Sequence, residues 1–360
     1  MDDISILWDL IEQGKCGKNV GLSTGLKKLD KIIGGIQPSR YYLLGAGSSV
    51  GKSALVIFIM YQLLRYGKDP VTFIYYSLEL GAEVILSKLM GLYCAEEFGI
   101  HLTTNDIFSF EHPISDSDYE KLAQAKDWLN SVKDNLIIID KGLSARILYK
   151  ETLPILEDLG YIDINEEGRE FYVQNDPRRK VIGIIDHLSL ARAEDGRTKK
   201  AEMDLMSSYM VTIKRKFKMS WFALMQHNRE SSSMDRRKAD LNEPTLSDLK
   251  DTGSPSEDAD VVIQLFYPYR EKLTTYRDYK ILSKGGLGDV FRSLIITKNR
   301  YGIANKVIGA AFYGSIGWWN ELPPGADIEN FSDYVDEFEN VPCKLKDKEE
   351  KDEVKLKLKF

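Results

Sequence analysis

Residues 41–53 read YYLLGAGSSVGKS, and this stretch constrains the fold more than any other part of the chain. The apolar run that ends at Gly45 predicts a buried strand, and the apolar run after Ser53 predicts a helix. A strand, a loop of small residues and a helix, in that order, are the context that a phosphate-binding P-loop requires. The backbone N–H groups of such a loop surround the phosphates, helped by the positive N-terminus of the helix. The stretch therefore predicts an α/β fold that binds a nucleoside triphosphate.

Two side chains of this stretch have defined tasks in such a loop. Lys52 would reach the β- and γ-phosphates, and the Ser53 hydroxyl would ligate Mg²⁺. Ala46 stands where the pattern G-x-x-x-x-G-K-S has its first glycine. The alternative, a glycine-rich turn between two core elements, is disfavoured by the flanking strand and helix. The predicted nucleotide-binding residues are Ala46, Gly47, Ser48, Ser49, Val50, Gly51, Lys52 and Ser53.

The composition is ordinary for a globular protein, with 43% hydrophobic and 29% charged residues in a chain of 360. Three widely separated cysteines exclude a disulfide framework and a four-cysteine zinc site, which fits a reducing cytosol. No apolar run is long enough to span a bilayer, so we expect no membrane partner. The net charge of −6 gives no overall attraction for nucleic acid, so DNA would have to be held by local basic loops.

Glu79 follows the apolar run 71–76, which predicts a second buried strand. We expect this strand to lie beside the P-loop strand, so that Glu79 points into the nucleotide crevice. Glu79 is therefore the candidate general base that polarises the water attacking the γ-phosphate. Its alternative role is to cap the helix predicted over residues 82–98.

Two later strands also end in side chains suited to phosphate chemistry. The run 181–185 ends at Asp186, which has the pattern of a Walker B aspartate that holds Mg²⁺. The run 221–225 ends at Gln226, the candidate sensor of the γ-phosphate. The four histidines lack metal-ligand spacing and are predicted to be structural: His101, His112, His187 and His227.

The ends of the chain differ from its middle. Ile4, Leu7, Trp8 and Ile11 share one face of a helix predicted over residues 3–13. This apolar face would pack on its own domain or on a neighbouring subunit, and the sequence does not decide between them. The polar segment 161–180 is predicted to be an inserted surface hairpin or loop, and residues 331–360 a charged, disordered tail.

From residue 21 to about 319 the chain resembles the RecA-type motor domain of DnaB-family replicative helicases, including the phage primase–helicases. The resemblance rests on an ordered set of segments: GLSTGLKKLDKIIGGIQPS, GAGSSVGKS, YYSLEL, IIDHLSL, MQHNR, SDLKDTGSPSEDAD and TKNRYG. It implies a RecA-like P-loop core with a mostly parallel central sheet flanked by helices and a terminal antiparallel strand pair. It also implies that ATP or another NTP binds with Mg²⁺. Alanine at position 46 is common in this family.

The resemblance implies roles for the individual residues. Glu79 matches the catalytic glutamate, Asp186 the Walker B aspartate and Gln226 the γ-phosphate sensor. Lys298 and Arg300, at the tip of a predicted hairpin, match the basic pair that reaches into a neighbour's site, where Arg300 would be the arginine finger. A solvated hairpin tip is the alternative reading of these two residues.

The same resemblance also implies a loop that holds DNA. Lys250, Asp251 and Gly253 match the loop that contacts single-strand phosphates in the central channel of the ring. Lys250 stands where arginine is more usual, which keeps the charge but loses a bidentate fork.

The implied protein is an ATP-dependent replicative DNA helicase that translocates on single-stranded DNA as a ring homo-hexamer. Residues 1–20 would be a linker helix and linker, and residues 21–330 the motor domain. Because only about twenty residues precede this core, we expect a minimal, phage-like motor whose primase, helicase loader or polymerase are separate chains. The alternatives are a recombinase or regulatory ATPase like RecA or KaiC, acting without unwinding, and a non-catalytic assembly factor that binds nucleotide.

Overall fold

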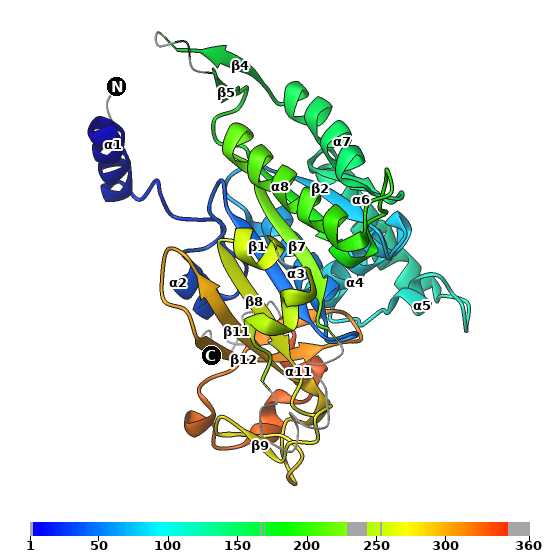
Figure 1. Ribbon diagram of the computed structural model, residues 1–360. Coiled ribbons are helices and arrows are strands. Elements are labelled where there is room, and N and C mark those ends of the chain that lie inside the picture. Colours follow the sequence, from blue (N-terminus) through cyan, green and yellow to red (C-terminus); the bar gives the residue numbers. More distant parts are fainter. Residues whose placement is uncertain (1–2, 166–167, 169, 229–242, 253, 345–360) are drawn as a thin grey trace.

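The computed structural model describes residues 3–165, 168, 170–228, 243–252 and 254–344. A sheet of nine strands crosses this part of the chain, in the order β13-β12-β11-β8-β1-β7-β6-β2-β3 (Figure 1). Six strands are parallel: β1 (Tyr41–Ala46), β2 (Val71–Ser77), β3 (Leu136–Ile139), β6 (Lys180–Asp186), β7 (Ser220–Gln226) and β8 (Val261–Phe266). Three are antiparallel: β11 (Phe291–Asn299), β12 (Lys306–Tyr313) and β13 (Trp318–Glu321). The predicted RecA-like class is confirmed, and β13 is an additional strand.

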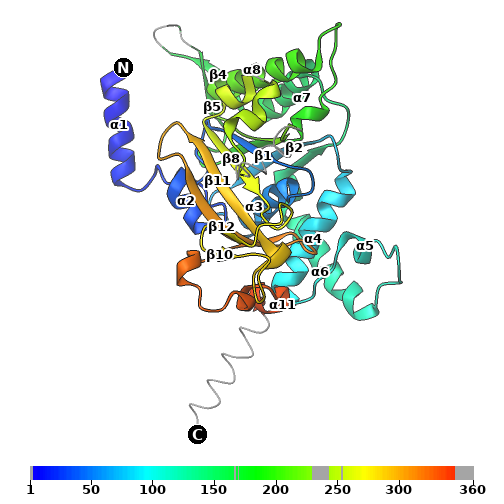
Figure 2. The same cartoon turned by 60° about the horizontal axis from the view of Figure 1, so that its bottom comes forward.

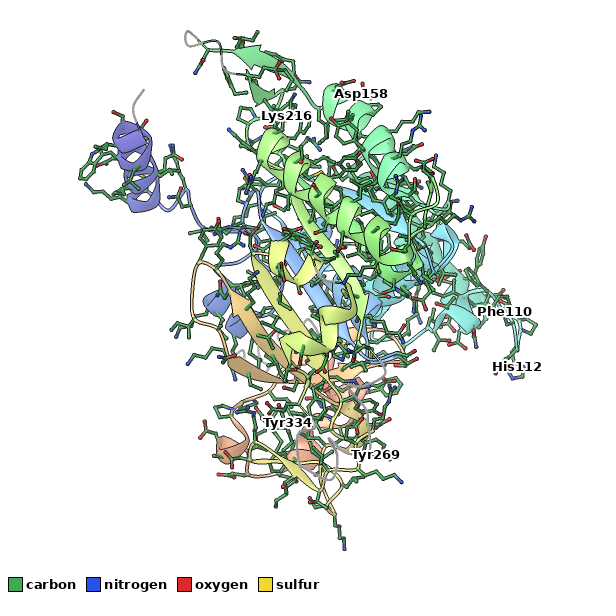
Figure 3. The ribbon with its side chains drawn as sticks, viewed as in Figure 1. Phe110, His112, Asp158, Lys216, Tyr269 and Tyr334 are labelled. Carbon is green, nitrogen blue, oxygen red and sulfur yellow. The ribbon has the colours of Figure 1, made fainter. Side chains whose placement is uncertain are left out.

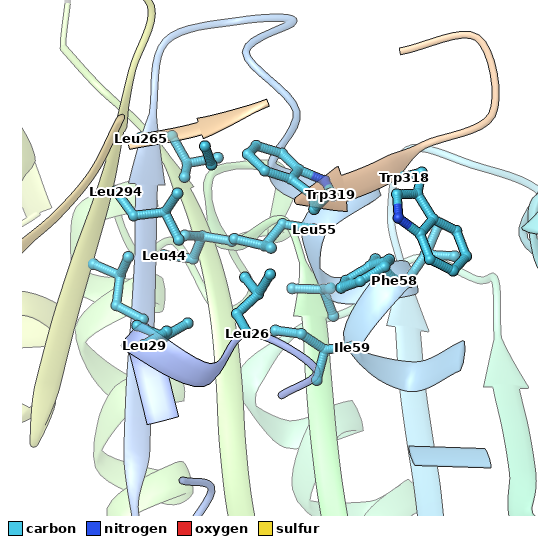
Figure 4. Close-up of a cluster of buried hydrophobic side chains, with 14 of the residues drawn as sticks. Leu26, Leu29, Leu44, Leu55, Phe58, Ile59, Leu265, Leu294, Trp318 and Trp319 are labelled. Atoms are coloured by element: carbon cyan, nitrogen blue, oxygen red, sulfur yellow. The ribbon is translucent and has the colours of Figure 1, made fainter. Parts of the chain in front are cut away.

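Helices cover both faces of the sheet (Figures 1 and 2). Alternate residues of β1 divide between the two cores: Tyr42 and Leu44 face one, Tyr41 and Leu43 the other. Figure 4 shows part of the first core, where Trp318 and Trp319 of β13 pack over Leu55 and Phe58. On that face lie α2 (Lys27–Ile33), α3 (Lys52–Tyr66), α4 (Ala82–Phe98) and α6 (Asp116–Val132). On the opposite face lie α7 (Ala145–Asp158) and α8 (Lys199–Phe217).

Shorter elements complete the described chain. The helices among them are α5 (Thr104–Ile107), η1 (Lys133–Asn135), η2 (Leu188–Leu190), η4 (Leu246–Thr252), α10 (Ser254–Asp258), η5 (Gly288–Val290), η6 (Gly325–Asp327), η7 (Phe331–Tyr334) and α11 (Glu337–Asn340). The small strands β9 (Thr275–Tyr276) and β10 (Tyr279–Lys280) pair with each other. Among the described residues, no helix is both long and apolar enough to cross a lipid bilayer.

The predicted surface hairpin is present as β4 (Gly160–Ile164) and β5 (Glu170–Gln174), which pair antiparallel. Tyr172 attaches it to the fold, because its buried side chain donates a hydrogen bond to the Leu156 carbonyl at 2.6 Å. In Figure 3, Asp158 and Lys216 lie near the hairpin, at the opposite end of the molecule from Tyr269 and Tyr334.

The predicted N-terminal helix is α1 (Asp3–Lys15), which stands apart from the rest of the fold in both views (Figures 1 and 2). Each of its described side chains is exposed. Trp8 is 60% exposed and Leu7 56%. Of the two expected docking modes, packing on its own domain is therefore absent from this structure.

The expected disorder from residue 331 is wrong for residues 331–344. Phe331, Val341 and Cys343 are buried, and the ring of Phe338 stacks on His101 with 4.1 Å between the ring centroids. Apolar side chains interspersed among the acidic ones anchor this segment, although its composition is highly charged. Residues 345–360 lie outside the described part of the chain.

Candidate nucleotide-hydrolysis site

The carboxyl ends of the parallel strands bring three predicted site residues together. Gln226, the last residue of β7, is level with Ala46 at the end of β1. Asp186 ends β6, level with Ser77 at the end of β2, and Glu79 follows two residues later. Ligands of open α/β sheets bind outside these strand ends. The geometry therefore unites Glu79, Asp186 and Gln226 with the P-loop.

The expected position of the Glu79 strand is wrong. β2 does not lie beside β1, because β7 and β6 occupy the two positions between them. These two strands come later in the chain, so the connection from β1 through α3 must pass over the positions that they fill. Glu79 still reaches the site because it lies beyond the end of its strand and lines the same cavity as Lys52.

A cavity of about 440 Å³ opens at these strand ends. One wall consists of P-loop residues, including Ser48, Gly51 and Ser53, and another of the segment 312–317 from the C-terminal strands. The remaining polar lining comes from Lys52, Glu79, Lys88, His187 and Gln226.

The backbone explains which P-loop positions need glycine. Gly51 has a φ of +113°, and a Cβ atom there would lie 2.9 Å from Cζ2 of Trp319. Ala46 instead ends β1 as a buried residue in extended backbone, where an alanine fits. Its carbonyl accepts hydrogen bonds from the His227 N–H at 3.0 Å and from Lys52 Nζ at 3.2 Å.

Lys52 begins α3, and its side chain folds over the loop. Besides the Ala46 carbonyl, Nζ donates to the Gly47 carbonyl at 3.1 Å. Burial lowers the pKa of Lys52, and the nearby carboxylates of Asp186 and Glu79 oppose this shift. A buried ammonium group beside a helix N-terminus fits an anionic phosphate.

Asp186 presents a carboxylate where a cation is expected. Its side chain is fully buried, and Oδ2 accepts a hydrogen bond from the Tyr75 hydroxyl at 2.7 Å. Its Oδ1 atom is buried without a hydrogen-bond partner among the described residues. Such an oxygen is costly unless it is satisfied. Asp186 therefore fits the predicted Mg²⁺ site, and Ser53, the other predicted ligand, lines the cavity. No group of three or more His, Cys, Asp or Glu in the described chain could enclose a metal.

Glu79 lies at the mouth of the cavity with 55% of its side chain exposed. Its Oε2 atom is 3.9 Å from Nε2 of His187. Burial lowers the pKa of His187, the main effect, although Glu79 acts in the opposite direction; the imidazole is therefore neutral at pH 7. The alternative role for Glu79 is absent here, because Gly81 is the N-cap of α4 and the Ala82 N–H donates to Asp140 at 3.2 Å.

Two arginines that the sequence analysis missed hold the outer side of the P-loop. Arg270 donates to the Ser48 carbonyl and, at 3.4 Å, to the Ser49 carbonyl. Arg292 donates from Nε to the Val50 carbonyl at 3.0 Å. A charged residue inside the apolar β11 run was a signal for Arg292, and no pattern marks Arg270.

Arg292 is itself buried and closely supported. Its guanidinium carbon lies 3.5 Å from the centre of the Tyr267 ring, and burial lowers its pKa to about 10. Because P-loop N–H groups face inward to the phosphates, the carbonyl groups need donors on the outside. Arg270 in the connection between β8 and β11, and Arg292 near the start of β11, supply them.

Lys298 and Arg300 lie far from this cavity. Asn299 is level with Val261, the first residue of β8, whereas the P-loop follows the last residue of β1. Since β1 and β8 are parallel, the two sites are at opposite ends of the sheet. Arg300 therefore cannot reach the P-loop of its own chain.

The candidate DNA loop is described only in part. Lys250 and Asp251 belong to η4, while their side chains and Gly253 lie outside the described features. The loop base contacts the P-loop strand, since a Cβ atom at Gly45 would lie 2.9 Å from Cδ2 of Leu249.

Known proteins similar to this chain include replicative DNA helicases. The replicative DNA helicase DnaB of Pasteurella multocida is 26% identical over 315 residues, which are 86% of this chain and 57% of that protein. The corresponding protein of Helicobacter pylori strain J99 is 25% identical over 255 residues, 70% of this chain and 45% of that protein. The chain thus spans about half the length of such relatives.

Two solved structures share the fold. One is an isolated ATPase domain, which has a TM-score of 0.69 and 21% identity, with 89% of this chain and 98% of that chain covered. The other is a DnaB-like replicative helicase, studied for its interactions with primase, which has a TM-score of 0.67 and 22% identity, with 90% and 67% covered. The family described as DnaB-like helicase C terminal domain matches residues 21–316. Because this match takes in most of the chain, the protein belongs to the DnaB-like helicase C-terminal domain family.

Proposed function

We propose that the protein is an ATP-dependent replicative DNA helicase that translocates on single-stranded DNA as a ring homo-hexamer. One observation carries the proposal: Glu79, Asp186 and Gln226 line up at the P-loop, whereas Arg300 lies at the opposite end of the same sheet. A complete hydrolysis site then needs two copies of the chain, which a closed ring supplies at every interface.

The residues divide the chemistry among them. ATP, or another NTP, would lie along residues 46–53, with Mg²⁺ held by Ser53 and Asp186. The bound Mg²⁺ would neutralise charge on the phosphates. Glu79 accepts a proton from the water that attacks the γ-phosphate, Lys52 stabilises charge on the phosphate oxygens, and Gln226 senses the γ-phosphate.

The neighbouring subunit completes the site. Its Arg300 acts as the arginine finger on charge that develops at the γ-phosphoryl group, and its Lys298 assists. Lys250, Asp251 and Gly253 from each subunit would line the central channel and hold single-strand phosphates. Salt-dependent binding through a few such loops is compatible with a net charge of −6.

Helix α1 would join neighbouring subunits. Its apolar face is exposed, and an apolar groove of about 800 Å³ lies between α4, α6 and the edge strand β3. Leu86, Met90 and Leu122 line this groove, and Lys126 and Lys133 stand in its lining. We propose that α1 of a second copy fills the groove, with its Asp9 and Glu12 near the two lysines.

The remaining partners follow from the resemblance alone. A primase, a helicase loader or a polymerase encoded separately would cooperate with the ring, in a bacterial cytosol or that of a phage-infected host. The alternative function, a RecA-like or KaiC-like ATPase without unwinding, shares the P-loop chemistry. The loop SDLKDTGS and the basic pair Lys298 and Arg300 favour the helicase over this alternative.

ATP hydrolysis with and without single-stranded DNA, measured beside the unwinding of a forked duplex, tests the proposal. We expect DNA to stimulate hydrolysis and the fork to be unwound. Glu79→Gln is the matched control: it should abolish turnover and unwinding while nucleotide binding is retained, since it removes only the base. Hydrolysis that ignores DNA, together with an intact fork, would favour the alternative ATPase.

A further inference from the structure

Asp260 is a buried carboxylate that the hydrolysis chemistry does not use. It immediately precedes β8, at the end of the sheet remote from the P-loop, and its side chain is 1% exposed. Oδ1 accepts a hydrogen bond from the Arg300 guanidinium at 3.1 Å. Oδ2 accepts from Lys214 Nζ and from the Tyr41 N–H, the latter at 2.9 Å. Both carboxylate oxygens of Asp260 thus accept hydrogen bonds. Of the side chains of Asp260, Lys214 and Arg300, only that of Arg300 reaches the surface.

Backbone bonds fix the same three segments together. The Arg300 N–H donates to the Asp260 carbonyl at 2.8 Å, and the Asp260 N–H donates to the Tyr41 carbonyl at 2.8 Å. Lys298 is held nearby, where its Nζ atom donates to the carbonyls of Ser256 and Glu257 at the end of α10. The basic pair is therefore anchored, in contrast to a freely solvated hairpin tip.

From this arrangement we infer that Asp260 is a positioning residue that aims Arg300 at the nucleotide of the adjacent subunit. The inference rests on the proposed trans role of Arg300. Arg300 is 46% exposed on its side chain, and a guanidinium group has five N–H donors in a fixed plane. The guanidinium group can therefore keep its hydrogen bond to Asp260 while its other N–H donors bind a phosphate of the adjacent subunit's nucleotide.

The charge balance explains why a buried carboxylate suits this task. Lys214 is 6% exposed on its side chain, and its positive charge balances Asp260 in the interior, so Arg300 remains the net positive charge at the surface. Tyr41 starts β1, the strand that carries the P-loop at its other end. Arg300, the proposed arginine finger for the neighbouring subunit, is thus held through Asp260 on β1, the strand that leads into the P-loop of its own subunit.

The test variant is Asp260→Asn combined with Lys214→Met, since Asp260→Asn alone would leave a buried ammonium unpaired. Lys216→Met is the matched control on α8, because Lys216 pairs with Glu170 and not with the cluster. We expect kcat for ATP to fall about 10- to 100-fold in the double variant, as for a displaced catalytic group. KM for ATP and the melting temperature should stay near the wild-type values, because the variant's own P-loop is intact.

Mixed rings separate a misplaced finger from a damaged fold. Lys52→Ala protomers keep a working finger, so mixing them with the double variant should restore hydrolysis at composite sites. Mixing the double variant with Arg300→Ala protomers should restore nothing, because neither carries a working finger. Wild-type kcat in the double variant, or no rescue by Lys52→Ala protomers, would overturn the inference.

A reference pair of variants distinguishes a failure of the Asp260 inference from a failure of the proposed function. Arg300→Ala mixed with Lys52→Ala should regain hydrolysis if the site is shared between subunits. Rescue in this pair but not with the double variant would overturn only the role of Asp260. No rescue in either pair would overturn the shared site and, with it, the positioning role.

Discussion

At the residue scale, the P-loop is shaped from outside as well as by its own sequence. Arg270 and Arg292 bind the carbonyl groups of Ser48, Ser49 and Val50. Both guanidinium groups lie close to the ring of Tyr267: its centre is 5.2 Å from the guanidinium carbon of Arg270 and 3.5 Å from that of Arg292. Arg270 and Arg292 thus form a clamp on the loop carbonyls, which orients the loop so that its N–H groups face the cavity.

Replacing Arg270 tests the clamp without disturbing the core, because this side chain is exposed. Arg270→Ala should raise KM for ATP by about tenfold, the equivalent of one charge-assisted hydrogen bond of roughly 1.4 kcal/mol. The melting temperature should hardly change. Arg277→Ala is the control: it lies in the same connection, is exposed and pairs with Glu243 instead. Equal KM values in the two variants would show that Arg270 does not shape the loop.

At the element scale, the segment 331–344 is part of the motor fold. It lies against the C-terminal strands and the end of α4, where Lys344 pairs with Glu97 and Cys343 packs near Gly99. Its buried apolar side chains join the core that also holds α3 and β13.

Phe331→Ala measures this contribution. Phe331 is 4% exposed, and truncating a buried phenylalanine costs about 3–5 kcal/mol of the free energy of unfolding. Phe338→Ala, at a position that is 54% exposed, should cost much less. Urea denaturation gives both values, and equal small losses would mean that the segment adds little to the core.

At the scale of the whole molecule, the chain presents two unpaired surfaces that suit each other. The apolar face of α1 is exposed, and an apolar groove is lined by α4, α6 and β3 of the same chain. Helix α1 lies apart from α4 and α6 (Figure 2). A contiguous exposed apolar patch is typical of an interaction site. A ring in which each α1 fills the next groove would cover both surfaces at once.

Leu7→Asp tests this arrangement because it puts a charge on the apolar face of α1. We expect the hexamer to dissociate in sedimentation velocity and DNA-stimulated hydrolysis to be lost. The melting temperature of the protomer should be unchanged, since α1 is exposed along its described length. Gln13→Asp, on the opposite face of the helix, should assemble normally. An intact ring with Leu7→Asp would exclude α1 as the connecting element.

Local patterns were enough to identify the elements that carry the site. The predicted strand 71–76 lies within β2, and the predicted helix 82–98 coincides with α4, because apolar periodicity and flanking glycines are local signals. The same holds for Lys52, Glu79, Asp186 and Gln226, each of which stands in or just beyond a strand or loop that the pattern marks. Their assigned catalytic roles remain predictions.

Such local patterns could not predict the order of the strands or the contacts between residues far apart in the chain. The sequence by itself determined an α/β core with a P-loop, because strand, loop and helix follow one another within thirteen residues, 41–53. Only the tertiary structure decided the strand order that separates β2 from β1 and the seating of Arg270 on Ser48. It also decided the burial of Asp260 against Lys214 and Arg300. These contacts join residues 40 or more positions apart, and their partners are chosen by how the strands stack, which no local pattern encodes.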